Sequence, residues 1–127
     1  MVAMLSLAVI RIFGPGVAIN RMGEPVEFAR ATAVRLDIAV INTQLRLYKS
    51  MNGFYPTTEQ GLQALVTLPV TEPRPTRWFQ FLREKPKDPW GNDYVYRSPG
   101  KIHPDTYDLF SPGPDHIADT VDDDWGE

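Results

Sequence analysis

The sequence predicts an α+β fold in which one long N-terminal helix packs on a small antiparallel sheet. Two observations carry this prediction. Residues 26–51 contain no glycine or proline and repeat their apolar side chains at helical spacing. Near the C-terminus, residues 93–97 and 105–111 are rich in aromatic and aliphatic side chains and have the turn residues 98–100 between them. Such closely spaced segments favour adjacent antiparallel strands.

The predicted helix covers residues 25–51. Pro25 suits the first helical turn, where its missing N–H has no partner in any case. Gly53 can adopt the left-handed conformation that ends a helix. One helical face carries an apolar strip that comprises Val34, Ile38, Ile41, Leu45 and Tyr48. A second strip beside it comprises Leu36, Val40 and Leu47. The two strips form either one wide core-facing surface or two surfaces, the second one facing a neighbouring subunit.

Residues 54–92 are predicted to connect the helix to the sheet. Thr57 and Gln60 have the spacing of a capping box, which predicts a second, short helix from this point. Farther on, four apolar residues are predicted to return the chain to the core: Trp78, Phe79, Phe81 and Leu82. A turn rich in proline and glycine follows, and we interpret its Trp90 as a packing anchor.

Composition narrows the class of protein. A chain of 127 residues suits one domain, and the absence of cysteine removes disulfides and thiolate metal sites. A domain of this size gains from a structural metal or from self-assembly. The net charge is only -3, but the segment 105–127 holds eight acidic residues and no lysine or arginine. This distribution disfavours nucleic acid as a partner, because phosphate binding needs clustered basic residues.

No catalytic constellation is visible in the sequence. Gly-x-Ser-x-Gly and His-Glu-x-x-His motifs are absent, and neither histidine lies in a motif. Asp88 and Asp93 lie near Trp90 and can mimic a carboxylate pair, but we interpret them as a turn cap and a strand-edge charge. We therefore predict that the chain is not an enzyme.

The acidic segment after the second predicted strand has the composition of a calcium loop. Calcium binds six to eight oxygens from carboxylates and backbone carbonyls. Asp115 would come from the arm stiffened by the Pro-Gly-Pro sequence 112–114, and Asp122 and Asp123 from the returning arm. The loop lacks the EF-hand pattern, so a solvated acidic tail is the alternative. The apolar residues Val121 and Trp125 favour a docked loop.

Three motifs in the same order resemble a known family. Residues 52–65 (NGFYPTTEQGLQAL), 87–94 (KDPWGNDY) and 107–115 (YDLFSPGPD) are similar to segments of the major pseudopilins of bacterial type II secretion systems, the general secretion pathway protein G family. The resemblance covers residues 29–125. It implies a type IV pilin-like fold with a C-terminal calcium loop. It also places the calcium carboxylates on Asp115, Asp122 and Asp123, and backbone carbonyl ligands near Pro112 and Thr120.

The resemblance implies a structural function. Subunits of this family polymerise into a periplasmic pseudopilus that grows from the inner membrane of a Gram-negative bacterium and drives protein export. The implied partners are further copies of the chain, minor pseudopilins and the inner-membrane assembly platform. The alternatives are a minor pseudopilin or type IV pilin-like subunit, and a calcium-dependent extracellular adhesion module.

Residues 1–24 depart from the family pattern. They form an atypical apolar segment that is interrupted by Arg11 and by the sequence Gly-Pro-Gly at 14–16. The basic leader and the Phe-Thr-Leu-Ile-Glu motif of the family are not found in this segment. The resemblance therefore predicts a pseudopilin domain over 25–127, and it predicts neither peptidase processing nor membrane anchoring for this chain.

Overall fold

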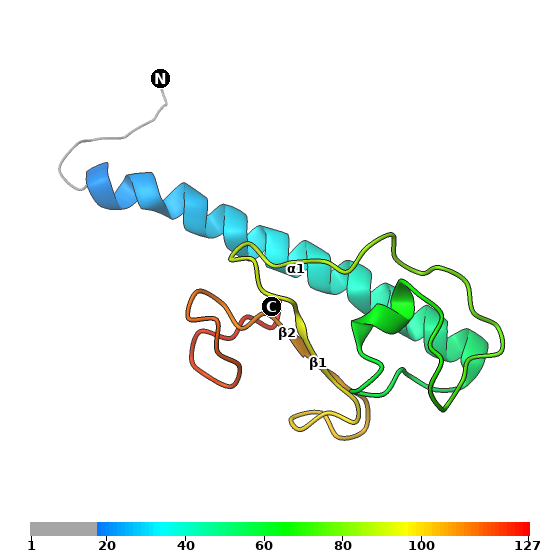
Figure 1. The fold of residues 1–127 in the computed structure, drawn as a ribbon. Helices are drawn as coiled ribbons and strands as arrows, with labels where there is room; N and C mark the ends of the chain where they lie inside the picture. The colour runs from blue at the N-terminus through cyan, green and yellow to red at the C-terminus, as the bar shows by residue number, and fades with distance from the viewer. Residues whose placement is uncertain (1–17) are drawn as a thin grey trace. The chain divides into compact units, whose positions relative to one another are not determined.

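The fold is one long helix with a short two-stranded antiparallel sheet beside its C-terminal part (Figure 1). The computed structural model describes residues 18–127, and the side chains from residue 25 onward. Its elements are the helix α1 (Ala18–Asn52), the 3-10 helix η2 (Leu62–Leu65), and the strands β1 (Val95–Arg97) and β2 (Asp108–Phe110). The predicted α+β class is confirmed.

The chain divides into two compact units after Ala31, within α1. In the first unit, Arg30 Nη1 pairs with Glu27 Oε1 at 2.9 Å on the exposed surface of the helix. The second unit, residues 32–127, contains the sheet, the hydrophobic core and the acidic loop.

The predicted start of the helix at Pro25 is wrong. α1 begins at Ala18 and holds Pro25 in its interior. The proline ring fixes φ near the helical value, so a helix can continue through it at the loss of one backbone hydrogen bond. The predicted segment 1–24 lies outside the described residues as far as residue 17. Within residues 18–127, no helix combines the length and the apolar content of a membrane span.

The predicted end of the helix is confirmed. α1 ends at Asn52, and Gly53 follows with a φ of 90°, a conformation that glycine adopts without strain. The N–H of Gly53 donates to the carbonyl of Lys49 at 2.7 Å, which satisfies one of the last carbonyls of the helix.

The two apolar strips of α1 have different environments. All five residues of the first strip are buried in the core: Val34, Ile38, Ile41, Leu45 and Tyr48. The second strip lies on the open side of the helix, where Leu36, Val40 and Leu47 are 60%, 52% and 39% exposed. Of the two interpretations that the sequence left open, the single wide core-facing surface is therefore wrong.

The hairpin pairs Val95 with Phe110 and Arg97 with Asp108. Both strands are shorter than predicted, and side-chain hydrogen bonds to α1 hold the residues that precede them. Tyr94 Oη donates to Asp37 Oδ2 on α1 at 2.6 Å. On the other strand, Tyr107 Oη donates to the α1 residue Asn42 at 2.6 Å. These two hydroxyls fasten the hairpin to the helix, and neither contact was predicted.

The connecting segment forms its capping box without forming the predicted helix at that point. Thr57 N–H donates to Gln60 Oε1, and Gln60 N–H donates to Thr57 Oγ1, both at 3.0 Å. The chain then turns through Gly61, whose φ is 64°, and only afterwards enters η2. Since that left-handed residue interrupts regular helix geometry, the helical segment starts at Leu62.

The aromatic residues of the connecting segment pack as predicted, with one exception. Phe81 is buried, and Trp78 and Trp90 are partly buried against the core. The indole N–H of Trp78 donates to the carbonyl of Ala64 at 2.7 Å. Phe79 is the exception, because it stacks on Phe81 at 4.1 Å but leaves 43% of its surface exposed.

We expect Leu45→Ala to lower the free energy of unfolding by about 2–5 kcal/mol, because it opens a cavity in the hydrophobic core. Leu36→Ala, at an exposed position on the same helix, is expected to change it by less than about 1 kcal/mol. Urea unfolding followed by circular dichroism measures both values. Equal losses in the two variants would contradict the assignment of core and open faces.

Candidate metal centre

The turn before the sheet holds the first arm of the acidic loop in place. The buried Asp88 carboxylate accepts the N–H groups of Trp90 at 3.0 Å and of Asn92 at 2.8 Å, so it caps the turn as predicted. Its Oδ2 also accepts the hydroxyl of Ser111 at 2.6 Å. The Ser111 oxygen accepts the N–H of Gly113 at 3.0 Å, which fixes the chain where the loop begins.

The amide side chain of Asn92 fastens the same arm a second time. Its Nδ2 donates to the carbonyl of Gly113 at 3.0 Å, and its Oδ1 lies 2.6 Å from His116 Nδ1. Gly113 has a φ of 80°, and a Cβ at this position would overlap the carbonyl oxygen of Asp122. The two arms of the loop therefore touch at Gly113, where only glycine fits.

The returning arm is docked on the hairpin. Ser111 and Asp124 exchange both backbone hydrogen bonds, each at 2.8 Å. The ring of Trp125 packs on that of Phe110 with centroids 4.4 Å apart, and Gly126 lies against the side chain of Ile38. The solvated acidic tail is thus ruled out, and the prediction that Trp125 docks is confirmed. Val121 is fully exposed, so the same prediction for Val121 is wrong.

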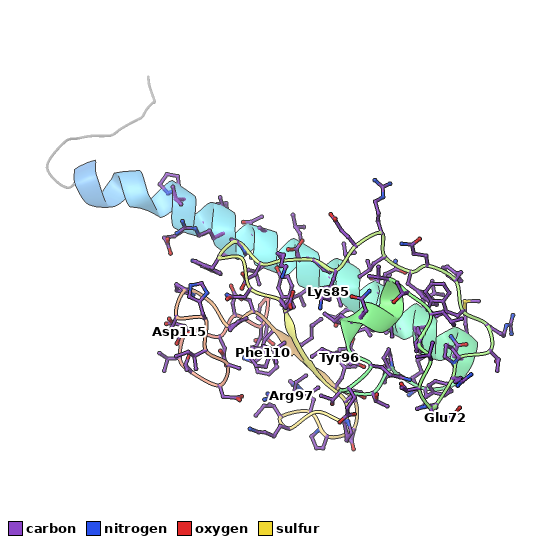
Figure 2. The ribbon with its side chains drawn as sticks, in the orientation of Figure 1. Glu72, Lys85, Tyr96, Arg97, Phe110 and Asp115 are labelled. Atoms are coloured by element: carbon purple, nitrogen blue, oxygen red, sulfur yellow. The ribbon has the colours of Figure 1, made fainter. Side chains whose placement is uncertain are left out.

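Asp115 lies at the bend of the loop (Figure 2). Its Oδ2 accepts the hydroxyl of Thr120 at 2.6 Å, and its Oδ1 accepts the N–H of Ile117 at 3.0 Å. The bond from Thr120 is the main cause of a lowered pKa for Asp115. Two of the predicted site residues, Asp115 and Thr120, are therefore in direct contact.

Asp123 carries a carboxylate oxygen that no group of the loop satisfies. Its Oδ2 accepts the N–H of Asp119 at 2.9 Å. Its Oδ1 is buried and has no hydrogen-bond partner within the described part of the chain. A buried carboxylate oxygen without a donor is costly, and a bound cation removes that cost. The buried, unpaired Oδ1 of Asp123 is therefore the observation that supports a calcium ion at these residues.

The structure brings some of the predicted ligands together and leaves others apart. Thr120 contacts Asp115, and Asp122 lies against Gly113, the residue after Pro112. Among residues 18–127, however, no three acidic or histidine side chains converge into one metal-binding group. Calcium would thus draw on backbone carbonyls as well as carboxylates, and the site stays a prediction.

A second carboxylate centre, which the sequence analysis missed, lies under the loop that joins β1 to β2. Asp108 is fully buried and accepts the backbone N–H groups of Lys101, Ile102 and His103 at 2.7–2.9 Å. Burial favours the neutral acid, but these N–H donors outweigh it and lower the pKa of Asp108 to about 2. A Cβ on Gly100 would lie 2.5 Å from Asp108 Oδ1, so the turn has room only for glycine.

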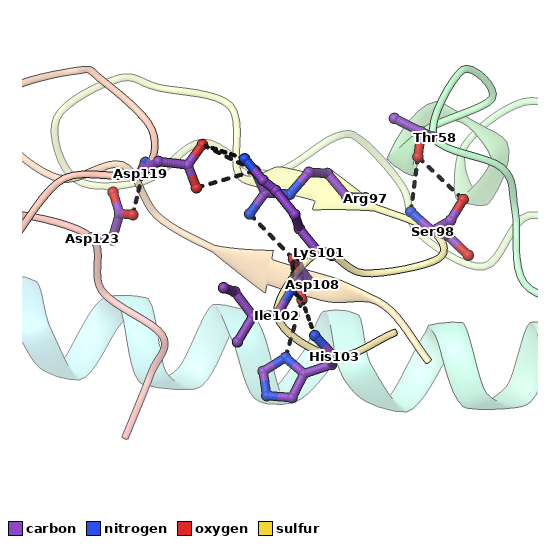
Figure 3. Close-up of polar contacts among 9 residues, drawn as sticks. All are labelled: Thr58, Arg97, Ser98, Lys101, Ile102, His103, Asp108, Asp119 and Asp123. Atoms are coloured by element: carbon purple, nitrogen blue, oxygen red, sulfur yellow. Dashed lines mark hydrogen bonds and ion pairs between the residues drawn. The ribbon is translucent and has the colours of Figure 1, made fainter. Parts of the chain in front are cut away.

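Arg97 joins this centre to the acidic loop (Figure 3). Its Nη2 forms an ion pair with Asp108 Oδ2 at 3.2 Å. Its Nη1 donates to both carboxylate oxygens of Asp119, each at 3.1 Å. The bond from Arg97 is the main cause of a lowered pKa for Asp119. The sequence offers only an arginine in a strand and an aspartate 22 residues later, which is no signal for their pairing.

The comparisons with known proteins agree with one another. The family model described as type II secretion system (T2SS), protein G, matches residues 21–125. The type II secretion system core protein G of Dickeya chrysanthemi is 41% identical over 122 residues, which cover 94% of this chain and 78% of that protein. The protein of the same description from Vibrio cholerae is 42% identical over 113 residues, covering 88% and 75%.

One solved structure is similar over most of its length. It is the crystal structure of the major pseudopilin from the type 2 secretion system of enterohaemorrhagic Escherichia coli. The TM-score is 0.71 at 38% sequence identity, and the alignment covers 88% of this chain and 94% of that chain.

We expect Asp108 to make the free energy of unfolding decrease as the pH is lowered through a narrow acid range. Because its pKa is lower in the folded state, the carboxylate stabilises the fold above its ordinary pKa and loses this effect as the pH falls toward 2. The contribution at neutral pH is roughly 2 kcal/mol. Asp108→Asn should remove it and flatten the decline in urea-unfolding free energy between about pH 4 and pH 2. Asp105→Asn, at an exposed position nearby, is the control. An unchanged slope in Asp108→Asn would contradict the assignment.

Proposed function

This chain belongs to the type II secretion system protein G family and is a structural subunit of a pseudopilus, and we propose that its copies polymerise through the open face of α1. We also propose that a calcium ion holds the acidic loop of each copy. The family consists of structural subunits rather than catalysts. The match over residues 21–125 carries the proposal, since it includes both α1 and the acidic loop.

The open face of α1 supports polymerisation. Leu36, Val40 and Leu47 expose apolar surface along one side of the helix, while the strip from Val34 to Tyr48 is buried in the core. A row of exposed apolar side chains on a rigid helix is typical of a protein–protein contact. An identical row is present in every copy, so repeated use of one contact builds a filament.

The chemistry of the acidic loop supports calcium. Asp115, Asp122 and Asp123 supply carboxylates, and the carbonyls of Pro112 and Thr120 are the proposed backbone ligands. These are the hard oxygen donors that calcium prefers. The ion would relieve the repulsion among the carboxylates and would satisfy the buried oxygen of Asp123. Its role is structural, because it joins the two arms of a loop that ends the domain.

We place the domain in the periplasm of a Gram-negative bacterium, at the inner membrane from which the filament grows. Its proposed partners are other copies of itself, minor pseudopilins and the inner-membrane assembly platform. The relatives from Dickeya, Vibrio and Escherichia support this placement, since all of them carry type II secretion in their description.

Leu36→Asp should abolish filaments without unfolding the domain. The substitution places a charge on the proposed contact, but the position is exposed in the single subunit. We expect at least a tenfold loss of filaments by electron microscopy when the variant is expressed with the other components of a secretion system. Leu68→Asp, at a loop leucine of similar exposure, is the control. Normal filaments from Leu36→Asp would contradict the proposed contact.

Removal of calcium should lower the melting temperature of the protein. At a free calcium concentration about 100 times the Kd, the ion contributes roughly 2.7 kcal/mol. Asp115→Ala and Asp123→Ala should lower the melting temperature in calcium and respond little to chelator, whereas Asp105→Ala should behave as the wild type. Differential scanning calorimetry with and without chelator measures this. A wild-type melting curve that does not respond to excess chelator would overturn the calcium site.

A further inference from the structure

Arg97 is held more firmly than an ordinary surface arginine. Its side chain is only 19% exposed, and its guanidinium lies 5.1 Å above the ring of Phe110. On one side it pairs with Asp108, a buried carboxylate that three backbone N–H groups hold in place. Contacts within the hairpin therefore help to hold Arg97 in place.

The acidic loop is attached to this arginine at Asp119. Arg97 Nη1 donates to both oxygens of the Asp119 carboxylate. Asp119 has a φ of 68°, a left-handed conformation that an aspartate adopts more readily than most residues. In that conformation its backbone N–H donates to Asp123 Oδ2 and fixes the carboxylate that bears the buried, unsatisfied Oδ1. The contacts form a continuous path from the hairpin to Asp123 (Figure 3).

We propose that Arg97 is a positioning residue, which fixes the acidic loop through Asp119 and so orients Asp123 toward the cation. The part of the proposal that concerns the cation rests on the proposed calcium site. Arg97 itself contacts no proposed ligand. It acts as the outer partners of metal ligands do, whose loss usually weakens metal binding 10- to 100-fold.

Simple electrostatics predicts the opposite effect. A positive side chain near a cation site repels the cation, so its removal should strengthen binding. A positioning residue should weaken binding when it is removed. The sign of the change in calcium affinity thus separates the two roles.

Lys101 provides the matched control for this test. Its Nζ also approaches Asp119, at 3.8 Å, but its side chain is 64% exposed. An exposed lysine at this distance carries the same charge without the fixed two-oxygen contact, and such pairs contribute little. Lys101→Gln and Arg97→Gln therefore remove one positive charge each from the surroundings of the same carboxylate.

The experiment measures calcium affinity by isothermal titration calorimetry for the whole chain and its variants. We expect about a tenfold weaker affinity for Arg97→Gln and for Asp119→Asn. The double variant should be no weaker than either single one, because both changes break one connection. Lys101→Gln should stay within about twofold of the wild type or bind slightly more tightly. Asp119→Asn leaves the pair between Arg97 and Asp108 intact, so it tests the connection even if Arg97→Gln folds poorly.

A second measurement does not depend on the metal. Amide hydrogen exchange in excess chelator should be about tenfold faster for residues 115–123 in Arg97→Gln and Asp119→Asn, and unchanged in Lys101→Gln. If the wild type binds calcium but the first two variants bind it as well as the wild type or better, the positioning role is overturned. If the wild type binds no calcium, the calcium site is wrong. Amide hydrogen exchange then remains as the test of the loop attachment, and equal exchange rates in all variants would overturn the attachment of the loop by Arg97.

Discussion

The buried face of α1 is the constraint on which the rest of the domain depends. A two-stranded hairpin of three-residue strands is not stable by itself, and the chain has no cysteine to brace it. Ile41, Leu45 and Tyr48 belong to the same buried hydrophobic cluster as the hairpin residues Tyr96 and Leu109. The hydroxyls of Tyr94 and Tyr107 then fix where along the helix the hairpin lies, because each reaches one polar residue of α1. Burial provides the free energy, and these two hydrogen bonds provide the register.

Contacts with the turn before the sheet and with the hairpin hold the acidic loop in place. Asp88 and Asn92 hold the first arm at Ser111 and Gly113, and Arg97 holds the far side at Asp119. Most of the supporting contacts are charged or buried, which makes them stronger than exposed pairs between neutral groups. The loop is thus largely shaped by the protein itself, and a cation would complete a closed arrangement and not create one. This explains how a loop rich in carboxylates can dock its tryptophan on Phe110.

Local rules predicted the parts of the fold that local interactions determine. The helical face from Val34 to Tyr48, the glycine that ends α1 and the cap on the turn at Asp88 all follow from spacing and backbone chemistry within a few residues. The start of α1 did not follow, because a proline favours the first turn without being confined to it. Asp108 was also missed. It stands among aromatic and apolar residues in a strand, and only the folded loop 101–103 shows why a carboxylate is buried there.

The distribution of charge links the candidate site to assembly. Arg97 neutralises Asp108 and Asp119, whereas within residues 18–127 Asp115, Asp122 and Asp123 form no ion pair with a lysine or arginine. These three carboxylates, which no lysine or arginine neutralises, are the ones proposed as calcium ligands. In a filament every copy repeats this loop, so the unneutralised charge recurs along the polymer and opposes its growth. A divalent ion bound to each loop would remove much of that charge while it closes the loop. The proposed calcium would therefore stabilise the polymer as well as the single domain, and its effect on filaments should exceed its effect on the isolated subunit.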